Sequence, residues 1–318
     1  MKTYIGYSTD INIRHQATSG GVGSGLVKYL LDTEEVSYAL SFDYVSEHVC
    51  YQPKLVSSFS NYNICGSIYQ EMNLMREMKK LLDERSGEKG KIVLFSLPCQ
   101  TRALREICLK AGFTPIIIGL TCSSQQSHEA TTYLLSRLGI NEKDVKFIRY
   151  RGNGWPSGIQ VKVNNGNEYF VKNNSSIWTE IFHSKLFIQP RCFSCRNTLN
   201  DYADIVLADP WLREYVETET EGKTLFAAYT EIGENYISDS INSGYINAEE
   251  VDDKLLSKSQ ENTIYRKEAY YKHPGIRQLI KKLSFNDGYR RLLLKHPLFF
   301  KLHCLMRVRL ERLIIKKH

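Results

Sequence analysis

The first 150 residues alternate between short apolar runs and amphipathic segments, and this alternation constrains the fold more than any other feature. Two apolar runs, KIVLFS at 91–96 and TPIIIGLT at 114–121, predict strands that are buried on both faces. An amphipathic stretch lies between them, ends at Gly112 and predicts a helix. A strand, a helix and a second strand in this order are typical of a βαβ unit, so we expect an α/β fold.

Other apolar and amphipathic stretches continue this pattern along the chain. The predicted strands lie at 3–7, 38–45, 51–58 and 203–209, and the predicted helices at 26–33, 68–83, 128–139 and 176–187. From about residue 145 the pattern changes to alternating residues with Asn-Gly turns, which indicates antiparallel hairpins. We therefore predict a mixed sheet with βαβ units in the N-terminal half, antiparallel hairpins in the middle and a helical C-terminal tail.

The same change of pattern predicts how the chain divides into domains. A chain of 318 residues can bury a sizeable core. We expect one main domain over residues 1–272, divisible into subdomains at 1–144 and 145–272, and a basic helical tail over 273–318.

The positive charge of the chain is concentrated at its C-terminal end. The net charge is +7, and residues 286–318 hold nine Lys/Arg and two acids, so 9 − 2 = +7 lies there. A basic tail differs from a basic binding face, so we expect no nucleic-acid partner. We find neither an apolar run long enough to span a bilayer nor a secretory signal, and we expect a cytoplasmic protein.

Four of the eight cysteines stand where they could form one site. Cys192 and Cys195 form a C-x-x-C pair, whereas Cys99 and Cys122 each follow a predicted parallel strand. The carboxyl ends of neighbouring strands in an open α/β sheet border the crevice where ligands bind. Four thiolates suit either a tetrahedral zinc ion or a [4Fe–4S] cluster, and packing of cysteines in the core is the alternative.

A glycine-rich turn precedes the helix predicted at 26–33. Ser19 is placed to cap that helix, and Gly20 and Gly21 would let backbone N–H groups approach an anion. The segment is neither a G-x-G-x-x-G nor a Walker A motif, so a flexible capped turn is the alternative.

Two further segments hold polar candidates. Arg149, Arg151 and Trp155 could bind a phosphate or a flat ring, or they could be ordinary exposed strand residues. Asp204 and Asp209 could contact a metal or a ribose, or they could cap loops.

Taken in order, these segments resemble one family. Arg14 with the SGG turn, PCQ at 98–100, the Cys122 loop, IRYRGNGW, CFSC and ADIVLADPW are similar to the beta subunit of coenzyme F420-reducing hydrogenase and its relatives. The resemblance spans residues 3 to about 240. It implies an oxidoreductase that passes electrons between a [4Fe–4S] cluster and FAD, with hydride exchange between the flavin and a small molecule.

The resemblance also implies roles for particular residues. The cluster ligands would be Cys99, Cys122, Cys192 and Cys195. Ser19, Gly20 and Gly21 would hold part of the FAD, and Gln100, Arg151 and Trp155 would lie near the flavin. No catalytic residue is assigned. A single cluster would need a redox partner protein, and short relatives that accompany surface-polysaccharide genes suggest a role in that biosynthesis.

The sequence departs from the family pattern at three places. Ala208 replaces a usual glycine, Ser-Leu-Pro precedes Cys99 in place of Gly-Thr-Pro, and Ser-Ser follows Cys122 in place of His-Gly. These changes motivate an alternative function. In it, the chain is a non-redox protein that binds a nucleotide or nucleotide-sugar, with zinc or no metal at the cysteines.

The C-terminal tail predicts two helices separated at Pro297, because proline breaks a helix interior. The second helix, at about 298–316, has a predicted apolar stripe and a basic face that bears Lys301, Arg307, Arg309, Arg312, Lys316 and Lys317. Such a helix could pack on the domain with its charges in water. Alternatively, it could dock reversibly on an anionic membrane surface.

Overall fold

The computed structural model describes residues 2–173 and 177–315. The strands are β1 (Thr3–Ser8), β2 (Tyr38–Val45), β3 (Cys50–Val56), β4 (Gly90–Ser96), β5 (Phe113–Leu120), β6 (Val145–Arg149), β7 (Gly158–Val163), β8 (Glu168–Lys172), β9 (Ile205–Ala208), β10 (Thr224–Ala228) and β11 (Ile246–Val251). The helices are α1 (Ile11–Gln16), α2 (Val22–Asp32), α3 (Leu74–Asp83), α4 (Thr101–Lys110), α5 (His128–Arg137), α6 (Ile177–Ser184), α7 (Arg213–Thr218), α8 (Glu231–Asn242), α9 (Lys254–Ser259), α10 (Glu261–Lys272), α11 (Pro274–Ser284), α12 (Asp287–Lys295) and α13 (Pro297–Ile315).

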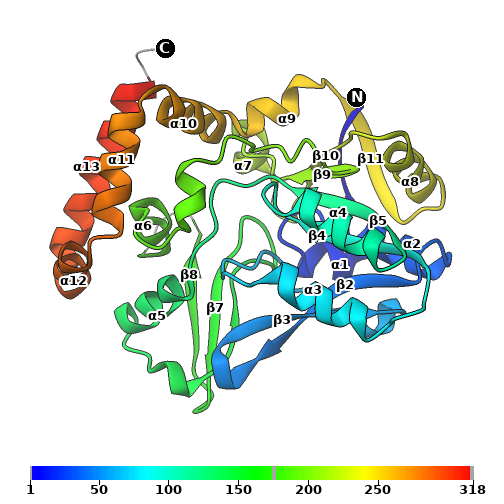
Figure 1. Ribbon diagram of the computed structural model, residues 1–318, viewed down its shortest axis with the longest axis horizontal. Coiled ribbons are helices and arrows are strands. Elements are labelled where there is room, and N and C mark those ends of the chain that lie inside the picture. The colour runs from blue at the N-terminus through cyan, green and yellow to red at the C-terminus, as the bar shows by residue number, and fades with distance from the viewer. Residues whose placement is uncertain (1, 174–176, 316–318) are drawn as a thin grey trace.

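An eight-stranded mixed sheet forms the centre of the molecule, with strand order β11-β1-β10-β9-β5-β4-β2-β3 (Figure 1). Strands β2, β4, β5 and β9 are mutually parallel, which confirms the predicted βαβ unit from β4 through α4 to β5. Strand β1 is antiparallel to β10, which is antiparallel to β9, so β1 runs in the same direction as the parallel group. The carboxyl ends of β1, β9, β5 and β4 therefore all lie at one edge of the sheet.

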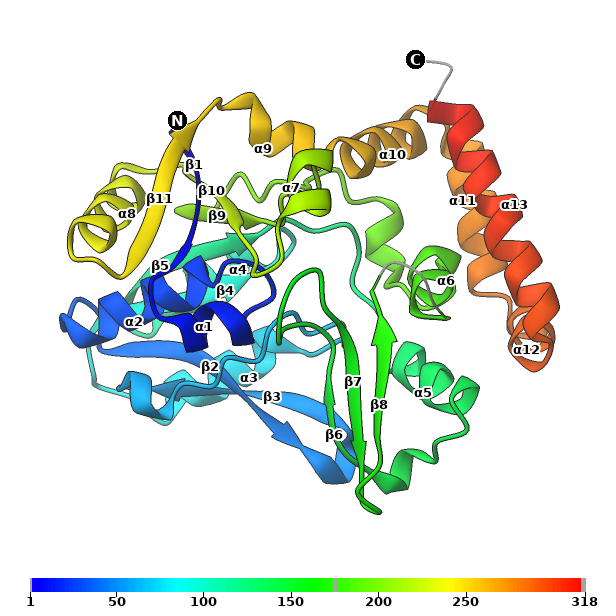
Figure 2. The ribbon, with the colours of Figure 1, turned by 180° about the vertical axis from the view of Figure 1, so that it is seen from behind.

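Helices cover both faces of this sheet because the strand residues alternate between two apolar clusters. Phe226 and Ala228 of β10 join the cluster that α2 and α8 complete, whereas Leu225 and Ala227 face the cluster that contains Leu256 of α9. Helices α3 and α4 cover the β2–β4 end of the sheet (Figure 2). The predicted mixed α/β fold is thus confirmed.

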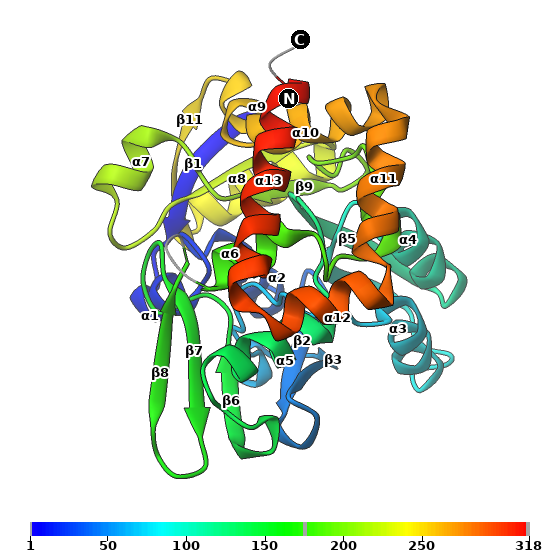
Figure 3. The ribbon, with the colours of Figure 1, turned by 90° about the vertical axis from the view of Figure 1, so that its left-hand side faces the viewer.

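A smaller antiparallel sheet, β6-β7-β8, follows in the chain, as the hairpin pattern predicts. Its apolar residues share one core with α5, α6 and the C-terminal helices, to which Leu293 and Phe300 contribute. Figure 3 shows α11, α12 and α13 on the outside of this region. The division into domains at residues 144 and 272 stays a prediction.

The helix predicted at 68–83 begins only at Leu74. Asn73 caps it, because its side chain accepts a hydrogen bond from the N–H of Arg76 at 3.3 Å. Before this cap the chain is irregular, and Gln70 is buried and donates through Nε2 to the Val49 carbonyl at 2.7 Å. This bond to the residue just before β3 holds residues 68–73 in an irregular path, where apolar spacing alone predicted a helix.

The break at Pro297 is confirmed, but the predicted apolar stripe of α13 is wrong. The buried face consists of Phe300, Cys304, Arg307, Glu311 and Ile314, whereas Leu298, Phe299, Leu302, Leu305, Met306 and Leu313 are exposed. The helix buries the Arg307–Glu311 ion pair, and the face that it turns toward the core is therefore not its most apolar face. Lys316 and Lys317 lie outside the described residues, as does the first residue of the helix predicted at 176–187. No helix within the described ranges has the length and apolar character needed to cross a membrane.

Candidate functional site

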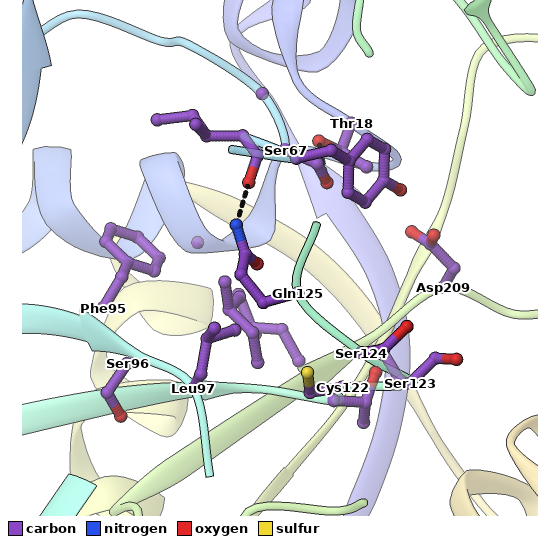
Figure 4. A pocket seen from close by; sticks show the side chains of 18 of the residues that line it. Thr18, Ser67, Phe95, Ser96, Leu97, Cys122, Ser123, Ser124, Gln125 and Asp209 are labelled. Carbon is purple, nitrogen blue, oxygen red and sulfur yellow. Dashed lines mark hydrogen bonds between the residues drawn. The ribbon is translucent and has the colours of Figure 1, made fainter. Parts of the chain in front are cut away.

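A large pocket opens at the edge where β4, β5 and β9 end, with a volume of about 1020 Å³. Residues after β4 and β5 form its floor, and the loop at 62–73 and the N-terminus of α2 form other walls. Figure 4 shows Phe95 and Leu97 on one side, Asp209 on the other and Gln125 between them, with Cys122 below. The Gln125 amide donates to the carbonyls of Gln70 at 2.6 Å and Ile68 at 3.4 Å, so this side chain fixes the 62–73 loop over the pocket.

The four predicted ligand cysteines come together beside this pocket. Cys99 and Cys122 follow β4 and β5, which are neighbouring parallel strands with Ser96 opposite Gly119. The loop that carries Cys192 and Cys195 returns to the same place, since the Cys122 N–H donates to the Thr198 carbonyl at 3.0 Å. The other three thiols lie close enough to Cys122 to act on its pKa. Cys99, Cys122 and Cys192 line the pocket, whereas Cys195 does not.

Burial favours the protonated thiol at two of these cysteines, Cys122 and Cys192. Burial raises the pKa of Cys122 to about 12, and the neighbouring thiols add to this effect. Burial also raises the pKa of Cys192. A bound metal would therefore have to displace the protons. Across residues 2–173 and 177–315, no group of three or more His, Cys, Asp or Glu side chains is arranged to hold a single metal ion.

The glycine-rich turn reaches the pocket, but in a different way from the prediction. The N-cap of α2 is Gly21, with φ 77° and no side-chain cap, and Ser19 instead shares a 3.0 Å hydrogen bond with the Thr224 hydroxyl. The Gly20 N–H donates to the same hydroxyl at 3.0 Å, so it is not available to a ligand. Val22 and Gly23, in the first turn of α2, line the pocket. Ser19 and Gly21 line the pocket as well, and a cofactor-binding role for Ser19, Gly20 and Gly21 stays a prediction. The backbone N–H groups best placed for an anion are those at the start of α2.

Arg151 and Trp155 lie behind the pocket wall rather than on it. Arg151 is 1% exposed, pairs with Asp209 and donates through Nη2 to the Thr18 carbonyl at 3.1 Å. Its guanidinium carbon lies 5.4 Å from the ring centroid of Trp155 and 5.3 Å from that of Trp211. Asp209 and Trp211 line the pocket. Arg151 thus orients a carboxylate and an aromatic ring that can touch a ligand.

Other predicted residues have structural contacts. Gln100 lines the pocket and accepts the Leu97 N–H through Oε1 at 3.1 Å, which closes the turn that carries Cys99. Asp204 is buried and accepts from Arg105 at 2.9 Å and from the Ile117 N–H at 2.8 Å, so it stabilises the sheet rather than a ligand. Arg149 donates to backbone carbonyls, including that of Ile64 at 2.7 Å.

Three residues of the site escaped the sequence analysis. Asn200 is fully buried and donates to the Ser96 carbonyl at 2.9 Å, which joins the Cys195 loop to the end of β4. Arg266 lines the pocket and Lys267 contacts the cysteine loops, and both come from α10. In the sequence, Arg266 and Lys267 form only a basic pair. Such pairs are too common to indicate a site.

Comparisons with known proteins agree with the resemblance. The model of the N-terminal region of the coenzyme F420 hydrogenase/dehydrogenase beta subunit matches residues 3–77, and the model of its C-terminal region matches residues 89–254. A chain from the F420-reducing [NiFe] hydrogenase complex of Methanosarcina barkeri, studied by xenon derivatization, shares the fold with a TM-score of 0.64. The two are 17% identical, over 86% of this chain and 91% of that chain. No curated protein sequence matches significantly.

Proposed function

The chain belongs to the coenzyme F420 hydrogenase/dehydrogenase beta subunit family, and from this membership we propose that it is an oxidoreductase with one [4Fe–4S] cluster and one FAD. One observation carries the proposal: four cysteines from three separate segments of the chain converge beside a pocket that the N-terminus of α2 also lines. When bound, the flavin would supply hydride exchange and the cluster would supply single-electron transfer.

The donor set fits an iron–sulfur cluster. Cys99, Cys122, Cys192 and Cys195 offer four soft sulfur ligands, which is the usual set for such clusters. The other three thiols act on the pKa of Cys122, and Cys99 and Cys195 act on that of Cys192, so the four side chains lie near one another. The chain would position the ligands through the strand ends of β4 and β5 and through the Thr198 carbonyl.

The pocket also fits a flavin dinucleotide. Its volume of about 1020 Å³ is at the upper end of the usual range for ligand sites. The start of α2 has no side-chain cap, so its first N–H groups are free of a capping side chain and suit a pyrophosphate. Asp209 and Trp211, held by Arg151, would contact the bound cofactor from the opposite wall.

We propose a small-molecule hydride donor or acceptor as substrate and a separate protein as redox partner. A role in surface-polysaccharide biosynthesis would make an unsaturated sugar intermediate one acceptor to test, beside a deazaflavin and a nicotinamide. A screen would follow reoxidation of the reduced flavin at a fixed concentration of each acceptor. An acceptor that reoxidises the flavin faster than buffer alone identifies the substrate class.

Purification without oxygen tests the cofactors directly. We expect a brown protein with about four irons and one flavin per chain. Cys195→Ser should lose most of the iron, whereas Cys50→Ser, which alters a half-buried cysteine away from the pocket, should keep it. A colourless protein with bound zinc would contradict the proposal and support the non-redox nucleotide-binding alternative.

We also propose cytoplasmic localisation with contact to the inner membrane face through the tail. The exposed face of α13 combines apolar residues such as Leu302, Leu305 and Met306 with the basic side chains of Lys301 and Arg309. The apolar side chains could insert into the lipid, and the basic side chains would be attracted to anionic headgroups. This electrostatic attraction contributes about 1 kcal/mol per basic residue.

Liposome flotation at low salt tests the membrane contact. The full-length protein should float with vesicles rich in anionic lipid and not with neutral vesicles. Replacing Lys301, Arg309 and Arg312 by Gln leaves the buried face of α13 intact and should abolish flotation. Absence of the full-length protein from the anionic vesicle fraction would refute this part of the proposal.

A further inference from the structure

Lys267 joins the Cys122 loop to the Cys195 loop from a helix outside the family-matched region. Its side chain is 6% exposed, and Nζ lies 3.7 Å from the Cys195 sulfur. Nζ also donates to the carbonyls of Cys122 and Asn197, each at 2.8 Å. The family match ends at residue 254, whereas α10 begins at Glu261. We infer that Lys267 is a positioning residue that raises the reduction potential of the cluster held by these cysteines.

The inference rests on the proposed function, and the physics is electrostatic. Adding an electron to a cluster bound by four thiolates makes the site more negative. A cation that donates a hydrogen bond to a ligand sulfur stabilises the reduced state more than the oxidised one. Since Lys267 is buried, water screens this interaction weakly. The cluster accepts one electron from the bound flavin or from an added reductant, and no proton transfer is needed.

Other basic side chains also lie near the cysteine loops. Lys185 is 2% exposed, and its Nζ makes no hydrogen bond within the described ranges. Burial lowers the pKa of Lys185 well below its usual value, and Arg266 and Arg307 lower it further, while Cys192 acts in the opposite sense. Glu311 is the carboxylate paired with Arg307. Arg266 also donates through Nη2 to the Ser123 hydroxyl at 2.6 Å, so a second cation lies beside the Cys122 loop.

The test compares variants of the anaerobically purified holoprotein by redox titration, with the reduced cluster followed by electron paramagnetic resonance. Lys267→Met removes the charge and the hydrogen bonds, Lys267→Gln keeps a donor without charge, and Lys267→Arg keeps the charge. Lys272→Met, which alters an exposed lysine on the same helix, is the matched control. Iron content and melting temperature are measured on every sample.

Lys267→Met should lower the ratio of reduced to oxidised cluster about tenfold at a fixed ambient potential, which equals a downward shift of about 59 mV for a one-electron couple. Lys267→Gln should shift it less, and Lys267→Arg and Lys272→Met should leave it near the wild-type value. Equal potentials in wild type and Lys267→Met would overturn the inference and leave the proposed function intact. Folded Lys267→Gln protein without iron would also overturn it, because the lysine would then serve assembly instead. A wild-type protein without a cluster would refute the proposed function itself.

Discussion

The Arg307–Glu311 pair on α13 can be compared with a matched pair elsewhere in the chain. Arg213 and Glu217 on α7 have the same residue types, order and i,i+4 spacing. The difference is burial: the side chains of Arg307 and Glu311 are 3% and 9% exposed, whereas those of Arg213 and Glu217 are 86% and 58% exposed. Glu311→Gln and Glu217→Gln therefore remove the same charge from two environments.

The expected losses in the free energy of unfolding differ by about tenfold between the two variants. Removing one partner of a buried ion pair costs about 3–5 kcal/mol, because the other charge stays buried without compensation. Here Arg307 would lose its partner while Lys185 and Arg266 remain nearby. An exposed i,i+4 pair contributes only about 0.3–0.5 kcal/mol. The amide oxygen introduced by Glu311→Gln can still accept the hydroxyl hydrogen of Tyr270, so the cost comes mainly from the lost charge.

Urea unfolding and hydrogen–deuterium exchange would measure these costs. We expect Glu311→Gln to lower the unfolding midpoint clearly and to speed exchange of the α13 amides, since this helix packs through the altered face. Glu217→Gln should match the wild type within about 0.5 kcal/mol. Similar small losses in both variants would refute the reasoning, because they would show that Arg307 finds water or another partner when the carboxylate is gone.

The pH dependence of stability gives a second check on the same carboxylate. Burial alone would raise the pKa of Glu311, but Arg307, Lys185, Arg266 and the Tyr270 hydroxyl together hold it below its ordinary value. A carboxyl group with a lower pKa in the folded state stabilises the fold above its unfolded pKa of about 4.3. That stability is lost as the pH falls through the folded pKa. The difference between wild type and Glu311→Gln should therefore be constant from pH 7 to about 5 and shrink in stronger acid.

Three further predictions follow from close contacts in the site. Gly20→Ala should destabilise the protein by more than about 1 kcal/mol in thermal melts, because the added Cβ would lie 2.5 Å from the Gly6 carbonyl oxygen. The control Gly275→Ala should be neutral, because its Cβ meets no atom within 4 Å. Arg151→Met should lower stability by about 3 kcal/mol and also weaken flavin retention, measured by absorbance after gel filtration, because it leaves the Asp209 carboxylate without its cation. In cofactor-free protein at pH 8, iodoacetamide should label the exposed Cys99 first and Cys122 very slowly. The pKa of Cys122, about 12, leaves about one thiolate in ten thousand at this pH. Equal labelling rates of the two cysteines in mass spectrometry would contradict this prediction.

The sequence was informative where neighbours in space follow from strand pairing. Cys99 and Cys122 could be placed together because parallel neighbouring strands end at the same edge, and the structure shows this register. The sequence was uninformative where hydrogen bonds or ion pairs of buried polar side chains determine the path of a loop or the buried face of a helix. Gln70 holds an irregular loop through a bond to Val49, and Arg307 turns a predicted exposed face inward. Neither effect leaves a periodic hydrophobic pattern, since each depends on polar contacts with a distant segment: Gln70 bonds to Val49, and Glu311, the partner of Arg307, accepts from Tyr270.

The pairing of β1 also has a consequence for how the protein is made. Thr3 lies opposite Ala227 and Val251, so the first strand has no partner until more than two hundred further residues have been synthesised. Until then the glycine-rich turn after β1 cannot reach Thr224, and the pocket lacks one wall. The pocket can therefore form only after β10 and β11 have been synthesised, late in translation.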